Sequence, residues 1–201
     1  MHPYDDPTLD PLSRFQLHLE AAHAVGPERL PEPTAFCLAT VSPDGQPSAR
    51  MLLIKHADAR GFVFHTNFLS RKGQELAANP RAAMCFHWQP LERQVRVEGV
   101  VEEVTAEEAD AYFQTRPRLR QLGAWASRQS EVIQPGESLD AIVAELEAKY
   151  EGQPVPRPPH WSGFRLRPNL YEFWVNGVGR LHIRHRYTRQ GDGWHVDTLF
   201  P

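Results

Sequence analysis

Cysteine is scarce in this chain of 201 residues, which contains only Cys37 and Cys85. Both lie in apolar stretches typical of β-strands, so we expect buried, unpaired thiols rather than a disulfide. Their spacing matches no metal-ligand pattern, and no metal site is predicted. Two unpaired thiols are typical of a protein of the reducing cytoplasm.

Long apolar runs are also missing, since no window approaches the roughly 20 apolar residues of a membrane span. The N-terminal sequence is acidic and rich in proline, and it lacks the basic and apolar regions of a signal peptide. The net charge of −3 gives no basic footprint for nucleic acid or for an anionic membrane surface. We therefore expect a cytoplasmic protein that binds neither nucleic acid nor membrane.

Several catalytic and nucleotide-binding motifs are absent as well. The chain has no Gly-x-Gly-x-x-Gly and no Walker-type loop, which disfavours a dinucleotide-binding fold. It has no Gly-x-Ser-x-Gly elbow and no Cys–His signature, so nothing argues for a hydrolase.

Short stretches rich in Val, Ile, Leu, Phe and Thr are what the chain does contain, separated by turn signals such as Pro43-Asp44-Gly45. The stretches expected as strands are residues 35–42, 46–56, 61–66, 81–88, 93–104, 161–168, 170–176, 180–188 and 194–199. Many short strands joined by hairpins predict a mainly β fold, a closed or nearly closed barrel with flanking helices.

Helix start signals are equally local. Asp10 before Pro11 and Ser70 before Arg71 are typical N-caps, and Thr105 with Glu108 has the spacing of a capping box. Helices are expected from residue 10 to Gly26, over 71–79, over 106–116 and over 139–150. We expect residues 1–9 to be a flexible N-terminal arm and residues 10–201 to form a single domain.

The most informative cluster is cationic. Arg50 and Lys55 flank an apolar strand, and Ser70-Arg71-Lys72 stands at a predicted helix start, where free N–H groups and the dipole favour an anion. The cluster suits a phosphate, although Arg71 and Lys72 could equally be a solvated helix face. Arg50 and Lys55 are an odd number of residues apart, so a regular strand would aim them at different groups unless a bulge intervenes.

A second cluster contains Tyr112, Arg116, Arg118 and Arg120. Tyr112 and Arg116 are four residues apart and share one face of a helix, where a phenol and a guanidinium can bind a second anion. Structural pairing with acidic neighbours is the alternative.

Two further groups lie later in the chain. Gln129-Ser130 could bind the edge of a planar heterocycle, although a turn explains the pair as well. Arg180, His182, Arg184 and Arg186 alternate along one face of a predicted strand. Such a row needs an anionic partner if it points inward, and protects a sheet edge if it points outward.

Six separated stretches occur in an order that resembles the pyridoxamine 5'-phosphate oxidase family. They are RMLLIKH, FHTNFLSRKGQEL, NPRAAMCFHWQPLERQVRVEG, YFQTRPR, GAWASRQS and EFWVNGVGRLHIR. The resemblance runs from about residue 10 to residue 201. It implies an FMN-binding split β-barrel and a homodimer with FMN at the subunit interface.

The resemblance also implies residue roles. The expected FMN-binding residues are Arg50, Met51, Leu52, Leu53, Ile54, Lys55, His65, Thr66, Arg71, Lys72, Gln94, Gln129, Ser130, Trp174 and Arg184, several of them from the partner subunit. The expected substrate-binding residues are Lys55, Tyr112, Arg116, Arg120, Arg180 and His182, of which Arg180 and His182 are the catalytic candidates over the pyridine ring.

The implied activity is the oxidation of pyridoxamine and pyridoxine 5'-phosphates by dioxygen to pyridoxal 5'-phosphate, with release of hydrogen peroxide. Four positions depart from the family pattern: Ile183 replaces an Asp, Arg120 a small hydroxyl residue, His65 a Tyr and Glu32 an Asp. Two alternatives stay open. One is a flavin oxidase of another substrate, as in phenazine pathways, and the other is a non-catalytic FMN or pyridoxal-phosphate binding protein.

Overall fold

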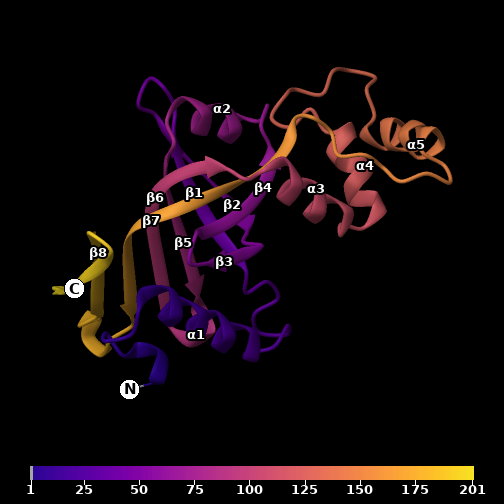
Figure 1. Ribbon diagram of the computed structural model, residues 1–201. Coiled ribbons are helices and arrows are strands. Elements are labelled where there is room, and N and C mark those ends of the chain that lie inside the picture. Colours follow the sequence, from indigo (N-terminus) through magenta and orange to yellow (C-terminus); the bar gives the residue numbers. More distant parts are fainter. Residues whose placement is uncertain (1) are drawn as a thin grey trace.

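The computed structural model describes residues 2–201 and is built on one antiparallel sheet with helices at its ends (Figure 1). The helices are η1 (Pro3–Asp5), α1 (Pro11–Ala24), α2 (Arg71–Ala78), η2 (Gln89–Leu91), α3 (Ala106–Gln114), α4 (Arg118–Ala126), α5 (Leu139–Lys149) and η3 (Val178–Arg180), where η denotes a 3-10 helix. The strands are β1 (Ala35–Val41), β2 (Pro47–Leu53), β3 (His56–Asp58), β4 (Gly61–Asn67), β5 (Arg81–Trp88), β6 (Arg93–Glu103), β7 (Trp161–Val175), β8 (Ile183–Gln190) and β9 (Gly193–Leu199).

The strand β7 determines how the sheet divides. Within residues 2–201 the sheet has nine strands: seven follow the order β2-β1-β5-β6-β7-β4-β3, and β8 and β9 extend it from β7. The first half of β7 pairs with β4 and its second half pairs with β8, while β6 follows it on the other edge. The β6–β7 register shifts at Gly99, where an added Cβ would lie 2.1 Å from the carbonyl oxygen of Arg167. Only glycine allows the two backbones to come this close where β7 changes partners.

The curled sheet encloses an aromatic core that α1 covers. Phe15 of α1 packs with its ring centroid 4.8 Å from Phe62 and 4.9 Å from Phe86, and all three side chains are fully buried. A second apolar cluster, which includes Phe113, Leu122 and Trp161, joins α3 and α4 to the start of β7. Figure 1 shows α3, α4 and α5 grouped beyond that end of the sheet, away from β8. The prediction of a mainly β, split-barrel fold with flanking helices is confirmed.

Several local predictions need correction. The strand expected over 46–56 breaks after Leu53, and residues 161–168 and 170–176 form one continuous strand. Residues 180–182 precede β8 instead of belonging to it, since Arg180 has a φ of +65° that no strand allows. Helix α4 was not predicted, because its N-cap Pro117 has no side chain that could signal the start.

The N-terminal segment differs from the loose arm expected for residues 1–9, of which Met1 lies outside the described residues. Arg93 donates to both carboxylate oxygens of Asp5, at 3.0 and 2.8 Å, and the fully buried Arg14 donates to the carbonyl oxygens of Tyr4 and Asp5. The Tyr187 hydroxyl donates to the carbonyl oxygen of Pro7. These contacts tie the segment to the sheet, and the division of the chain at residue 9 stays a prediction.

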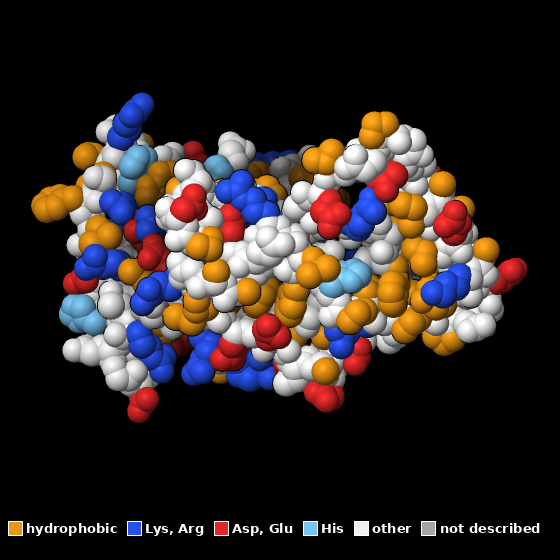
Figure 2. All heavy atoms as spheres, turned by 90° about the horizontal axis from the view of Figure 1, so that it is seen from above, with side chains coloured by type: hydrophobic (Ala, Val, Ile, Leu, Met, Phe, Trp, Pro, Cys, Tyr) orange, Lys and Arg blue, Asp and Glu red, His pale blue; other side chains and the backbone are white. Residues whose placement is uncertain are grey.

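The surface carries mixed charge. Figure 2 shows basic and acidic side chains interspersed on the face seen from above, in keeping with the small net charge of −3. Within residues 2–201, the helices are all too short or too polar to cross a membrane.

Candidate functional site

A group of cationic and hydroxyl side chains surrounds the start of α2. We call it the cationic cradle and define it as Arg50 of β2, Thr66 of β4, and Ser70, Arg71 and Lys72. Ser70 caps the helix through its hydroxyl, which accepts from the N–H of Gly73 and from Lys72 Nζ at 2.9 Å. Lys72 is only 7% exposed, and burial, followed by the charge of Arg50, lowers its pKa to about 8. A buried ammonium at a helix N-terminus is an arrangement that an anion would stabilise.

The loop after α4 closes this cradle. The side-chain oxygen of Gln129 accepts from Lys72 Nζ at 2.6 Å and from the Thr66 hydroxyl at 3.5 Å, and the Ser130 hydroxyl accepts from the backbone N–H of Arg71. Ser130 has a φ of +78°, a conformation that costs a non-glycine residue of order 1–3 kcal/mol and that concentrates at functional sites. Gln129 and Ser130 therefore lie beside the cations at the start of α2.

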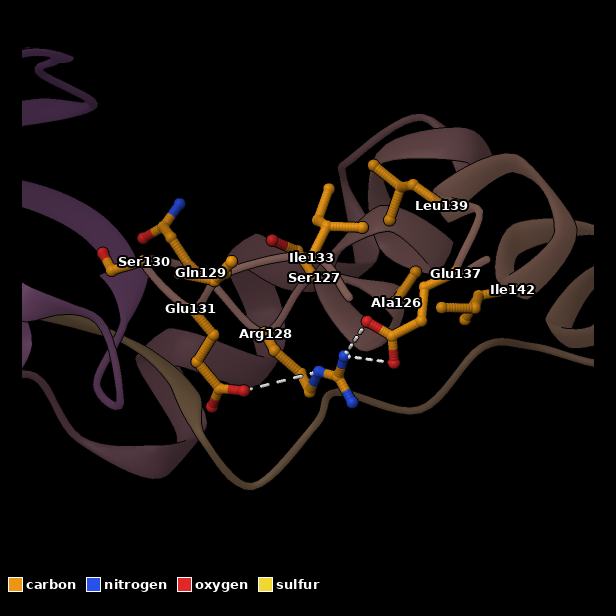
Figure 3. Close-up of a pocket in the computed structure, with 11 residues that line it drawn as sticks. Ala126, Ser127, Arg128, Gln129, Ser130, Glu131, Ile133, Glu137, Leu139 and Ile142 are labelled. Carbon is orange, nitrogen blue, oxygen red and sulfur yellow. Dashed lines mark hydrogen bonds and ion pairs between the residues drawn. The ribbon is translucent and has the colours of Figure 1, made fainter. Parts of the chain in front are cut away.

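An ion pair holds the same loop from its other side. Arg128 donates to the Glu137 carboxylate at 2.6 Å and lies 3.4 Å from Glu131. Figure 3 shows Arg128 turned toward these two acids, with Gln129 and Ser130 on the other side of the loop. The ion pairs of Arg128 thus hold one side of the loop, while Gln129 and Ser130 on its other side bond to the cradle.

A cleft of about 400 Å³ continues from the cradle toward α3 and α4. Its lining includes His65, Thr66, Arg116, Arg120 and Gln129, all of them predicted site residues. Leu52 and Trp161 also line it. The cleft thus runs from Gln129, which bonds to Lys72 of the cradle, to Arg116 and Arg120 of the second cationic cluster.

A stack of rings forms one wall of the cleft. The His65 ring lies 4.1 Å from Tyr112 and 5.1 Å from Trp161, and the Arg116 guanidinium lies 4.5 Å above Trp161. Burial, followed by the charges of Arg116 and Lys55, lowers the pKa of His65 to about 4, so the imidazole is neutral at physiological pH. His65 Nδ1 and a terminal nitrogen of Arg116 are buried and have no hydrogen-bond partner among the described residues. Such atoms mark a place that a polar ligand would complete.

Lys55 contributes a further cation near Arg116. It lies in the break between β2 and β3, and its backbone N–H donates to the carbonyl oxygen of Val63. Burial lowers its pKa, an effect that Glu32 opposes and that Arg120 and Arg116 reinforce. Arg50 instead bonds to Thr40, Ser48 and Glu75. The alternation expected of a regular strand does not apply to the pair, because β2 ends at Leu53 and Lys55 lies outside it.

The residues between Arg50 and Lys55 differ in exposure. Ile54 is 4% exposed and belongs to the core, so only its backbone could face a ligand, whereas Met51 is 63% exposed. Leu52 and Leu53 are half-buried.

Arg118 belongs to the second cationic cluster but is used structurally. It donates to Glu147 at 2.6 Å, so the alternative of pairing with acidic neighbours applies to Arg118 and not to Arg116.

The remaining predicted residues lie elsewhere on the sheet. Gln94, Trp174 and Arg184 are neighbours in register across β6, β7 and β8, and we call them the cross-strand row. The His182 ring lies 4.6 Å from Trp174, and Arg180 occupies the exposed turn before β8. Arg184 donates to both carboxylate oxygens of Glu172 at 3.0 and 3.1 Å. Arg186 pairs with Asp197, so Arg184 and Arg186, the two cations of the predicted row that lie on β8, both have acidic partners.

Within one chain, the cleft and the cross-strand row lie far apart. The cleft touches Trp161 at the start of β7, and the cross-strand row crosses β7 at Trp174 near its end. That stretch of strand spans roughly 40 Å at about 3.3 Å per residue. A site that uses both groups must therefore take them from two copies of the chain.

Two contributors were not identified from the sequence. Trp161 carries the ring stack, and Glu75 accepts from Arg71 Nε at 2.8 Å and from Arg50 at 3.2 Å. The i,i+4 spacing of Arg71 and Glu75 was the available signal for the second. For Trp161 the sequence offered only a strand position.

Comparison with known proteins gives a consistent result. Residues 27–150 match the family described as pyridoxamine 5'-phosphate oxidase, and residues 161–201 match the pyridoxine 5'-phosphate oxidase C-terminal dimerisation region. A pyridoxine/pyridoxamine 5'-phosphate oxidase of Myxococcus xanthus (strain DK1622) is 56% identical over 96% of this chain and 92% of its own length. The enzyme of the same name from Bordetella petrii is 54% identical over 98% and 92%.

Solved structures agree on the fold. PhzG from Burkholderia lata 383, crystallised with tetrahydrophenazine-1-carboxylic acid, superposes with a TM-score of 0.91 at 35% identity, over 100% of this chain and 98% of its own. A pyridoxamine 5'-phosphate oxidase-related, FMN-binding protein of Nostoc punctiforme PCC 73102 gives a TM-score of 0.74 at 17% identity, over 98% and 100%. The second likeness concerns the fold alone.

Proposed function

The chain belongs to the pyridoxine/pyridoxamine 5'-phosphate oxidase family, and from this premise we propose which of its residues carry out the reaction. Its activity is the FMN-dependent oxidation of pyridoxamine 5'-phosphate and pyridoxine 5'-phosphate by dioxygen. The products are pyridoxal 5'-phosphate and hydrogen peroxide. When bound, FMN supplies the two-electron acceptor that the chain's own side chains lack.

The cationic cradle fits the phosphate of FMN. Lys72 and Arg71 stand at the first turn of α2, where the helix N-terminus adds its own attraction for an anion. Thr66, Gln129 and Ser130 add hydroxyl and amide groups from two other segments. We assign these residues to FMN, together with Arg50 and the neighbouring residues 51–55.

The wall of the cleft fits the phosphate of the substrate. Lys55, Tyr112 and Arg116 converge there, and the unpartnered nitrogen of Arg116 is a donor that a phosphate oxygen would satisfy. Arg120 lines the same cleft and adds a second guanidinium group to this set. These residues orient the substrate by its phosphate and leave its pyridine ring to be positioned by other groups.

The rest of the site comes from a second subunit. The protein is a homodimer, and the region that mediates dimerisation, residues 161–201, contains most of the cross-strand row. We propose that Gln94, Trp174 and Arg184 of one subunit complete the FMN site of the other. Arg180 and His182, beside that row, are then placed to hold the pyridine ring against the flavin.

The proposal of a site shared between subunits rests on one observation, which is the distance along β7 between the cleft and the cross-strand row. It can be tested with hybrid dimers. One parent carries Arg71→Ala and Lys72→Ala, and the other carries Trp174→Ala and Arg184→Ala. Each parental homodimer should lose FMN, whereas the hybrid has one wild-type site and should bind about one FMN per dimer. A hybrid, verified by mass, that is as empty as its parents would contradict the shared site.

The phenazine alternative is less well supported. Its representative, PhzG, is 35% identical to this chain, against 53–56% for the vitamin B6 oxidases. The cations at Lys55 and Arg116 also suit a phosphorylated substrate.

We further propose that the protein is located in the cytoplasm, which its two free cysteines support.

A further inference from the structure

A buried carboxylate lies beneath the cationic cradle. The side chain of Glu75, one turn into α2 from Arg71, is only 4% exposed. An acid in this place is unexpected, because its negative charge opposes the binding of a phosphate above it. Its contacts explain how the site benefits from it.

Glu75 bonds to both arginines of the cradle. Its Oε1 accepts from Arg71 Nε at 2.8 Å, and its Oε2 accepts from a terminal nitrogen of Arg50 at 3.2 Å. The hydroxyls of Ser48 and Thr40 donate to the same Oε2, the former at 2.7 Å. One carboxylate therefore links β1, β2 and α2, the three elements that surround the cradle.

These bonds leave donors free mainly on Arg71. Each arginine has five N–H donors in a rigid fork. Arg50 uses both of its terminal nitrogens, on Leu38, Thr40, Ser48 and Glu75, whereas within residues 2–201 the side chain of Arg71 uses only its Nε. Its terminal nitrogens stay available, and its side chain is 57% exposed. Without Glu75, a long and exposed side chain would have to be ordered by the ligand itself.

The carboxylate is charged at every pH at which the protein would work. Burial by itself raises the pKa of Glu75, but hydrogen bonds from Ser48, Thr40 and Arg71 outweigh it and lower the pKa to about 2. The bridge is thus a permanent ion pair with both arginines and does not switch with pH.

We propose that Glu75 is a positioning residue that pre-orients Arg50 and Arg71 for the phosphate of FMN. The inference rests on the proposed function, because it takes the cradle to be the FMN phosphate site. It predicts that the benefit of ordering two guanidinium groups exceeds the repulsion between carboxylate and phosphate. It also predicts that the effect is confined to ligands that carry the phosphate.

The test compares FMN with riboflavin, which lacks the phosphate. Dissociation constants of both are measured on the apoprotein by quenching of flavin fluorescence, for the wild type, Glu75→Gln and Glu75→Asp. Glu75→Gln should weaken FMN about tenfold, a typical loss for an orienting partner, and leave riboflavin unchanged. Glu75→Asp keeps the charge but shortens the bridge, and should give a smaller loss that is again specific to FMN.

Two matched proteins complete the design. Glu147→Gln removes a carboxylate that pairs with Arg118 far from the cradle, and it should change neither constant. Arg71→Ala with Lys72→Ala should abolish the preference for FMN over riboflavin. Unchanged or tighter FMN binding in both Glu75 variants would overturn the inference, as would an equal loss for FMN and riboflavin. If the Arg71 and Lys72 variant keeps its preference for FMN, the phosphate site itself is wrong and the inference falls with it.

Discussion

Lys72 Nζ donates to the side-chain oxygen of Gln129 at 2.6 Å, which joins two segments 57 residues apart in the chain. The same nitrogen bonds to Ser70, so its donors are shared between the helix cap and the loop after α4. An arriving phosphate would compete with Gln129 for this ammonium group. The contact therefore connects occupancy of the cradle to the position of the loop that closes it.

The first prediction concerns the pH dependence of FMN affinity. Because the pKa of Lys72 is lowered to about 8, the free protein loses this charge as the pH rises through 8. The FMN dissociation constant should rise about tenfold from pH 7 to pH 9, since the bound phosphate holds Lys72 protonated. Fluorescence titration at several pH values measures it. Lys72→Met should bind more weakly and without this pH dependence; an identical pH profile in both proteins would exclude Lys72 as the titrating group.

The second prediction concerns the substrate phosphate. Arg116→Ala should raise KM for pyridoxine 5'-phosphate by about 10- to 100-fold, because a charge-assisted hydrogen bond of about 1.5–3 kcal/mol is lost. The flavin absorbance should be unchanged. Arg118→Ala is the control, since that side chain bonds to Glu147. Loss of flavin with an unaltered KM would place Arg116 in the cofactor site instead.

The third prediction concerns Arg180, whose side chain makes no hydrogen bond to another described residue and is exposed in the turn before β8. Arg180→Ala should lower kcat/KM by about tenfold or more while FMN stays bound, because the ring of the substrate loses a positioning group. Arg189→Ala, at the far end of β8, should not. Wild-type turnover in Arg180→Ala would remove this residue from the reaction.

The fourth prediction concerns acid stability. His18 is 1% exposed, and burial lowers its pKa from the ordinary 6.5 of a histidine to about 4. A lowered histidine pKa means that the unfolded chain binds the additional proton, so the stability is complete above pH 6.5 and falls as the pH decreases to 4. The loss from this residue is about 3 kcal/mol. Urea unfolding of the wild type and His18→Gln at both pH values should give a smaller decrease for the variant. Equal decreases would show that His18 is not responsible.

Local signals in the sequence predicted much of the fold. The caps at Asp10, Ser70 and Thr105 act on N–H groups within three residues, so they could be identified without the tertiary structure, and all three are present. The start of α4 at Arg118 has no such signal, and its place depends on the packing of Leu122 against Phe113 and Trp161.

The site was less accessible to sequence reasoning because its contacts are distant in the chain. Residue type and helix-start position identified Arg71 and Lys72. No local pattern shows that Gln129 reaches Lys72, that His65 stacks on Tyr112, or that Trp174 lies far along β7 from the cleft. The resemblance to a family supplied those positions, and the structure supplies their arrangement in space.

Oxygen uptake by the FMN-reconstituted protein with pyridoxine 5'-phosphate and pyridoxamine 5'-phosphate is the decisive measurement of the oxidase activity. We expect uptake with both, matched by the formation of pyridoxal 5'-phosphate and hydrogen peroxide. In that case Arg120 and Ile183 are tolerated departures from the family pattern. The absence of uptake from a protein that visibly holds its flavin would contradict the oxidase assignment and direct attention to those two positions.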